Sequence, residues 1–276
     1  MSEAFEHSNK RPNPSPRKPR KKRRKTLNLP PPIAVIDNYH DPNLCISEEE
    51  REAKFKGKQR SAQHVPGNYA SFVFLPISLD PKRRLDQVAL KCIYSLVHTE
   101  NTVELPATLT SMISHSSFSS WIHSQEDTIE LHISLSRLCT LRKDQISSFV
   151  DKVAAMSESQ SSHRIFALEF RNFAYLLNDD KTTSFLTITS SPECPGHSNV
   201  QTLLQDVDNI MKYFEFEPYY KESIPHISIG WKNVESCKEE YQSLQERELE
   251  QYFEIQFSTV ACKIGNKIYT NKLHRN

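Results

Sequence analysis

Glycine, long apolar runs and closely paired cysteines are scarce or missing in this sequence. Only 5 of the 276 residues are glycine, against 16 prolines. There is no apolar N-terminal segment of the signal-peptide type and no run of about 18 apolar residues. The 6 cysteines form no C-x-x-C pair and show no zinc-ligand spacing. We therefore expect a soluble, intracellular protein with reduced thiols that spans no membrane and binds no metal.

A positive net charge is also missing from most of the chain. Residues 1–25 hold ten Lys and Arg and two acidic side chains, whereas the remaining residues hold 25 basic and 32 acidic ones. An acidic body cannot grip long duplex nucleic acid through one broad basic face, but it can hold a short strand in a local groove. The run from Arg11 to Lys25 resembles a nuclear localisation signal. A basic arm that touches RNA non-specifically is the alternative, and the two roles can coexist.

Two regions differ in composition. Residues 1–62 are rich in proline and charge, which predicts a disordered basic leader. Residues 63–276 alternate strand and helix patterns and are expected to form one α+β domain with antiparallel strands and helices outside. Strands are predicted at 69–76, 128–136, 164–177, 183–188, 224–231, 253–262 and 267–273. Helices are predicted at 85–98, 144–156, 199–214 and 239–252, and a loop at 105–120.

Two of the predicted strands carry the same local pattern, an apolar residue or proline followed by His-Ile-Ser. The first contains His132 and Ser134, and the second contains His226 and Ser228. Because side chains alternate along a strand, each His shares a face with its Ser. The isoleucines between them then point into a core. If the two strands lie side by side, both His and both Ser reach one site.

Such a site suits phosphodiester chemistry. One imidazole can take a proton from an attacking hydroxyl while the other gives a proton to the leaving oxygen. Histidine serves both roles because its pKa lies near neutrality. The hydroxyls of Ser134 and Ser228 can donate hydrogen bonds to the phosphate oxygens. No metal and no cofactor are needed, and no acidic metal-binding cluster lies near either motif.

A third His-x-Ser match, His115 with Ser117, lies in a serine-rich stretch without a strand pattern, and we interpret it as chance. Trp231 follows the second motif, and its position in the alternation predicts a core residue on the face opposite His226.

The paired motifs resemble those of the 2H phosphoesterase superfamily, and within it most closely the U6 small nuclear RNA 3′-end processing phosphodiesterases. The likeness covers residues 65–273. It includes Gly67 to Ala70 at the start of an aromatic strand, the stretch from Leu131 to Arg137, and Lys263 to Lys267 as a C-terminal hairpin. The resemblance implies a 2H phosphodiesterase domain of two similar lobes about a pseudo-twofold axis. In such a fold, antiparallel sheets line a central cleft and each lobe carries one motif.

The same resemblance implies a metal-independent 3′-to-5′ exonuclease that trims the uridine-rich end of U6 small nuclear RNA. His132 and His226 would be catalytic, with the base and the acid not assigned, and Ser134 and Ser228 would bind phosphate. Tyr220 would stack on the terminal base, with Tyr219 as the alternative. The product would end in a 2′,3′-cyclic phosphate or the opened monophosphate. We expect a nuclear monomer whose partner is a single-stranded RNA 3′ end.

Two other functions fit parts of the sequence. The first is a 2′,3′-cyclic phosphodiesterase or RNA-ligase-like enzyme of tRNA splicing, which would leave a linear oligouridine intact. The second is a non-catalytic RNA-binding protein, which would have no need of both intact motifs.

Overall fold

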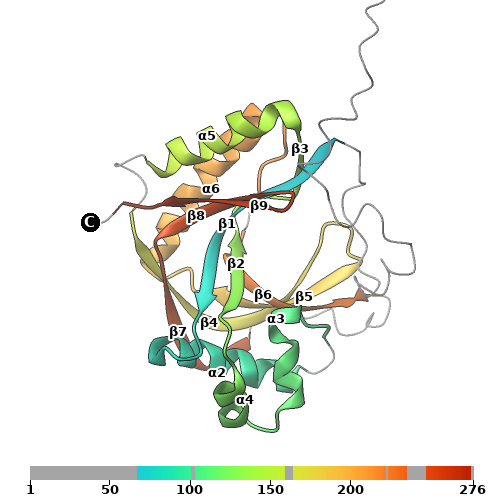
Figure 1. The fold of residues 1–276 in the computed structure, drawn as a ribbon, viewed down its shortest axis with the longest axis vertical. Coiled ribbons are helices and arrows are strands. Elements are labelled where there is room, and N and C mark those ends of the chain that lie inside the picture. The colour runs from blue at the N-terminus through green and yellow to red at the C-terminus, as the bar shows by residue number, and fades with distance from the viewer. Residues whose placement is uncertain (1–66, 101–102, 159–163, 222, 235–246, 275–276) are drawn as a thin grey trace, which may run out of the picture. The chain divides into compact units, whose positions relative to one another are not determined.

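The computed structural model describes residues 67–100, 103–158, 164–221, 223–234 and 247–274 (Figure 1). The leader expected at residues 1–62 lies outside this part of the chain. Within it, no helix is long and apolar enough to cross a membrane.

The first of two antiparallel sheets is built around β1 (Asn68–Leu79), a strand without a charged residue. β1 pairs with β2 (Ile129–Ser134), β3 (Cys139–Arg142) and β8 (Thr259–Ile264), and β8 pairs with β9 (Lys267–Lys272). The strand order is β2-β1-β8-β9, with β3 beside the start of β1. One face of β1 buries Val73, Leu75 and Ile77, so alternation leaves the intervening side chains on the other face.

The second sheet has the order β6-β5-β4-β7. It consists of β4 (Phe166–Leu177), β5 (Thr183–Ser190), β6 (His226–Asn233) and β7 (Arg247–Phe257). A turn at Asn178 joins β4 to β5, and its Oδ1 accepts hydrogen bonds from the backbone N–H groups of Thr182 and Thr183 at 2.9 and 3.0 Å. Lys181 in this turn has a positive φ of 53°. The hairpin predicted from these turn residues is confirmed.

Helices pack against both sheets. α5 (Ile146–Ser157) and α6 (Gly196–Tyr213) contact each other, α5 on β8 and β9 and α6 on β4, while α2 (Arg84–Thr99) contacts β1 and β7 (Figure 1). Short helical segments connect α2 to β2, namely α3 (Ala107–Thr110), a 3-10 turn (Ser111–Ser114) and α4 (Phe118–Ser124).

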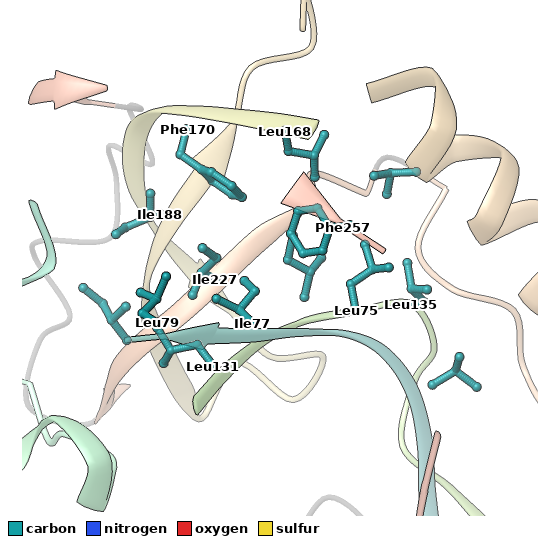
Figure 2. Close-up of a cluster of buried hydrophobic side chains, with 14 of the residues drawn as sticks. Leu75, Ile77, Leu79, Leu131, Leu135, Leu168, Phe170, Ile188, Ile227 and Phe257 are labelled. Atoms are coloured by element: carbon teal, nitrogen blue, oxygen red, sulfur yellow. The ribbon is translucent and has the colours of Figure 1, made fainter. Parts of the chain in front are cut away.

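The two sheets share one hydrophobic core. Figure 2 shows side chains from the two sheets in a single cluster, Leu75, Ile77 and Leu131 from the first and Leu168, Phe170, Ile188, Ile227 and Phe257 from the second. The chain passes from the second sheet to the first at Ser258, between β7 and β8. The sheets are therefore parts of one packed unit.

The α+β architecture with antiparallel sheets is confirmed, and several boundaries are corrected. The predicted loop at 105–120 contains α3, the 3-10 turn and the start of α4, which bury Leu109, Met112 and Trp121. The predicted helix at 239–252 is wrong from Arg247 onward, where β7 runs, and its earlier residues lie outside the described chain. The single strand predicted at 253–262 is two strands in different sheets. β3 was not predicted.

Candidate active site

The two motif strands lie side by side although they belong to different sheets. β2 ends the first sheet, β6 ends the second, and the two contact each other (Figure 1). In each strand the isoleucine between His and Ser is buried, Ile133 at 1% exposure and Ile227 at 0%. His132 and Ser228 are exposed, and His226 and Ser134 are half-buried. The predicted alternation is confirmed, and all four polar side chains are accessible.

His132 stands against aromatic side chains of β1. Its ring centroid lies 5.5 Å from that of Phe72 and 5.5 Å from that of Phe74, the latter in an edge-on arrangement. In the strand register, His132 is opposite Pro76 and Ser134 is opposite Phe74. These rigid neighbours restrict the imidazole, and they share its accessible face of the first sheet.

His226 has its ring orientation set by the backbone. Its Nδ1 lies 2.7 Å from the carbonyl oxygen of Ile224. A carbonyl can only accept, so Nδ1 carries the proton and, in the neutral ring, Nε2 is the free proton acceptor. Burial lowers the pKa of His226 from its ordinary 6.5, and the hydrogen bond to Ile224 offsets only part of this effect. The neutral ring with an available Nε2 is the form expected of a general base.

A third serine, Ser136, holds the segment after β2 against β1 by a hydrogen bond. The backbone N–H of Val73 donates to Ser136 Oγ at 2.9 Å, and Ser136 Oγ donates to the carbonyl oxygen of Arg137 at 2.9 Å. Ser136 is buried and has a structural role, whereas Ser134 is half-buried. This anchor fixes the backbone from which Arg137 projects.

Arg137 connects the first motif to the loop before the second one. Its guanidinium pairs with Asp179 of the β4–β5 turn, donates from Nε to the Pro218 carbonyl oxygen at 3.1 Å, and lies over the ring of Tyr220 with 4.1 Å from Cζ to the centroid. We did not single out Arg137 from the sequence. A basic residue three positions beyond the first His-x-Ser motif was the available signal, but its partners lie far along the chain.

Tyr219 and Tyr220 differ in how deeply their side chains are buried. Tyr219 packs against the core, its backbone N–H donates to Asp208 Oδ1 at 2.6 Å, and burial raises the pKa of its hydroxyl. Tyr220 is 42% exposed, with Arg137 over its ring. Tyr220 is therefore the tyrosine with ring surface available to a ligand. Its role in stacking stays a prediction.

A bulge in β6 changes the position predicted for Trp231. Ser228 is opposite Thr187, but Gly230 is opposite Leu186, so one extra residue lies in β6 between these pairs. Beyond the bulge, Trp231 is opposite Phe185, which shares its face of β5 with Thr187. Trp231 is thus half-buried on the face of His226 and Ser228, and the prediction of a core residue on the opposite face was wrong.

The third His-x-Ser match has a structural role. Ser117 is the N-cap of α4 and its Oγ accepts from the Ser120 N–H at 3.2 Å, while His115 Nδ1 lies 3.1 Å from Ser120 Oγ. The described residues contain no group of three or more His, Cys, Asp or Glu placed to hold a metal ion. A hollow of about 320 Å³ lies between α2 and β7, and no motif residue lines it; the chemistry-bearing residues lie elsewhere.

Comparisons with known proteins found matches that cover most of the chain. The model of the HVSL family, described as an uncharacterised conserved protein, matches residues 29–272. Two curated relatives are named U6 snRNA phosphodiesterase 1. The one from Danio rerio is 25% identical, covering 97% of this chain and 87% of the relative, and the one from Mus musculus is 26% identical, covering 89% and 83%. Among solved structures, Usb1 of Kluyveromyces marxianus matches with a TM-score of 0.44 and 13% identity, over 74% of this chain and 98% of that one.

Proposed function

This chain belongs to the HVSL family, and from that premise we propose that it is an RNA phosphodiesterase that removes nucleotides from the 3′ end of single-stranded RNA. The observation that carries the proposal is the pair of His-x-Ser motifs on the neighbouring strands β2 and β6, with His132, Ser134, His226 and Ser228 all accessible. The name of the curated relatives favours U6 small nuclear RNA as the substrate.

His226 is assigned as the general base. Its Nδ1 donates to the Ile224 carbonyl, which leaves Nε2 to take the proton from the 2′-hydroxyl of the penultimate nucleotide. The lowered pKa keeps the ring neutral at pH 7, as this role requires. The 2′ oxygen then attacks the adjacent phosphorus. The need for a 2′-hydroxyl restricts the activity to RNA.

His132 is assigned as the general acid. It gives a proton to the 5′ oxygen of the last nucleoside as the P–O5′ bond breaks, while the new P–O2′ bond closes a 2′,3′-cyclic phosphate. Ser134 and Ser228 donate to the non-bridging oxygens, whose negative charge grows in the transition state. The first step is thus a lyase-type cleavage. Opening of the ring to a monophosphate would add water with the two histidines in reversed roles.

The exposed ring of Tyr220 is assigned to the terminal base. Stacking on an aromatic ring contributes about 1–3 kcal/mol with little choice among bases. Arg137 covers the ring and holds it in place. A preference for uridine-rich ends would then come from other contacts of the protein or from the RNA molecules that reach it.

The test uses a 5′-labelled RNA that ends in oligouridine, incubated with the protein in EDTA, with products separated on a gel. We expect a ladder that shortens from the 3′ end, with new ends that resist phosphatase while they are cyclic. His132→Ala and His226→Ala should each lower the rate by at least about a thousandfold, since each removes one proton transfer. His115→Ala is the matched control and should trim at the wild-type rate.

Three results would oppose the proposal. Near-normal trimming by either motif variant would exclude the two-histidine mechanism. An intact linear oligouridine, together with hydrolysis of a 2′,3′-cyclic nucleotide, would instead favour the cyclic phosphodiesterase. RNA binding with neither reaction would favour the non-catalytic RNA-binding protein.

We also propose that the protein acts in the nucleus as a monomer. The basic run from Arg11 to Lys25 supports import. Removal of residues 11–25 from a fluorescent fusion should abolish nuclear accumulation, and light scattering of the purified chain should give the mass of one copy, 32.0 kDa. Unchanged accumulation, or a mass of two copies, would contradict the respective part.

A further inference from the structure

The face of the first sheet that carries His132, here called the open face, has further accessible side chains beyond the motif, on β1, β8 and β9. One row of cross-strand partners runs over all four strands of the main path, Ser134, Phe74, Ala261 and Thr270. The next row consists of Phe72, Lys263 and Ile268. On the other face, Val73, Cys262 and Ile264 are buried. At the far edge of the open face Ile268 is 58% exposed, and Thr270 and Lys272 are exposed too, whereas Phe74 and Ala261 within this face are buried.

This open face is basic at the edge away from the motif. The hairpin from Thr259 to Lys272 contains Lys263, Lys267 and Lys272 and no acidic residue. Lys263 and Lys272 lie on the open face, because they alternate in register with Ala261 and Thr270, whereas Lys267 is opposite the buried Ile264.

The edge strand of the second sheet has the opposite charge. β7 contains a single arginine and the three acidic residues Glu248, Glu250 and Glu254. A polyanion that leaves the site is therefore attracted along the first sheet and repelled from β7.

An aromatic side chain joins the basic edge to the catalytic residue. Phe72 is half-buried, its ring lies 5.5 Å from that of His132, and its cross-strand partner is Lys263. An aromatic ring beside a cation on an open sheet is an arrangement that binds single-stranded RNA, because a base stacks on the ring while the phosphate pairs with the cation. The three strand spacings from β2 to β9 cover about 14 Å.

We propose that the RNA upstream of the two reacting nucleotides lies on this face, running from β2 across β1 and β8 to β9. Phe72 stacks on a base, and Lys263 and Lys272 contact phosphates. The occupant is single-stranded RNA, since the face combines positive charge with an aromatic ring, and its accessible row of Phe72, Lys263 and Ile268 begins beside His132. This inference rests on the proposed function and adds a binding site that holds long substrates better than short ones.

The first measurement compares kcat/KM for an eight-residue oligouridine with kcat/KM for the dinucleotide UpU, which is too short to reach β9. The double variant K263Q/K272Q should lower this ratio on the order of tenfold through the loss of two phosphate contacts. Phe72→Leu keeps an apolar side chain but removes the stacking ring, and should lower the ratio by a similar factor. Lys267→Gln removes the same charge from the opposite face and should keep the ratio within about twofold of wild type.

The second measurement does not depend on turnover. Fluorescence anisotropy gives Kd for an oligouridine with a 2′-deoxy penultimate residue, which cannot be cleaved. In K263Q/K272Q the slope of log affinity against log salt should fall by about 1.4, or roughly 0.7 for each lost single-strand phosphate contact. If K263Q/K272Q keeps the wild-type ratio and slope, or if Lys267→Gln matches it, the proposal is overturned. Weakened binding in a protein that cleaves no RNA would uphold this face and refute the proposed function instead.

Discussion

His226 shows how one backbone contact prepares a side chain for chemistry. The Ile224 carbonyl lies two residues before it in the chain and 2.7 Å from Nδ1. This contact selects the tautomer and aims Nε2 away from the backbone, while burial favours the uncharged ring. Both effects act on the same histidine, which is why the two histidines are assigned different roles.

The pH dependence of kcat/KM follows from this pKa. A base works when unprotonated, and the pKa of His226 lies below the ordinary 6.5, so its neutral form persists as the pH falls through 6.5. Activity should decline only at lower pH, once the ring gains a proton. The measurement is kcat/KM for UpU from pH 4.5 to 9, with NMR titration of the His226 ring. An acid limb with its midpoint above pH 6.5 would contradict the assignment.

The sequence was most informative for residues whose position depends on strand alternation. His132, Ser134, His226 and Ser228 could be placed because buried isoleucines separate them. Trp231 could not, because the extra residue in β6 has no signature in an apolar strand. Arg137 could not either, since its partners Asp179 and Tyr220 come from segments that only the fold brings together.

At the scale of elements, Arg137 joins the end of β2, the β4–β5 turn and the loop before β6. Arg137→Ala should raise KM for oligouridine about tenfold with a smaller change in kcat, because Tyr220 loses the group that holds its ring in place. Arg171→Ala is a matched control. Arg171 also lies over an exposed tyrosine, 4.5 Å from the ring of Tyr252, and pairs with a carboxylate, Glu169, but it is distant in sequence from both motifs.

Steady-state kinetics on both variants decides the point. Equal effects of Arg137→Ala and Arg171→Ala would mean that the loss is a general stability effect. Restoration of KM by Arg137→Lys would mean that charge alone suffices and that the planar stack on Tyr220 is not needed.

The packing of α6 on β4 requires a glycine at position 196, where there is no room for a side chain. A Cβ at Gly196 would lie 1.8 Å from the backbone oxygen of Ala167, and backbone cannot yield as a side chain can. Gly196→Ala should lower the free energy of unfolding on the order of 3 kcal/mol. At Gly230 the nearest atom is a methyl of Val103 at 2.7 Å, so Gly230→Ala should cost less. Urea titrations compare the midpoints, and equal losses would contradict this reasoning.

Predictions for elements succeeded where an apolar pattern was long and failed where charge concealed it. α2 and α6 were expected within a few residues of their bounds, because their apolar stripes face the sheets. The first part of β7, from Arg247 to Tyr252, contains alternating glutamates and was predicted as a helix, whereas its last part was predicted correctly as a strand. Among the described strands, β7 lies at the edge of its sheet and pairs only with β4. Its few buried apolar residues, Phe253 and Phe257, contact the core.

For the whole molecule, the charge distribution limits the kind of RNA that binds. Outside residues 1–25, acidic side chains outnumber basic ones, and the basic open face is one narrow strip of the first sheet. A 3′ end inside a duplex should therefore be trimmed about a hundredfold more slowly than the same end in a six-nucleotide overhang, because the terminal base must unpair to reach Tyr220.

A hairpin RNA with a blunt 3′ end and the same hairpin with the overhang provide the pair of substrates, and the shortening rate of each is measured. Equal rates would show that the protein itself opens duplex ends, and they would contradict this prediction.

The pairing of β1 with β8 joins two segments of the described chain that lie about 190 residues apart in the sequence. Residues from Ser71 to Phe74 form their ladder with Ala261 to Ile264, so the first sheet cannot close until β8 has been synthesised. Contacts between such distant residues also slow folding. A nascent chain that still lacks β8 thus holds both motif histidines without a complete first sheet around His132. The site is therefore complete only after β8 has been synthesised and has paired with β1.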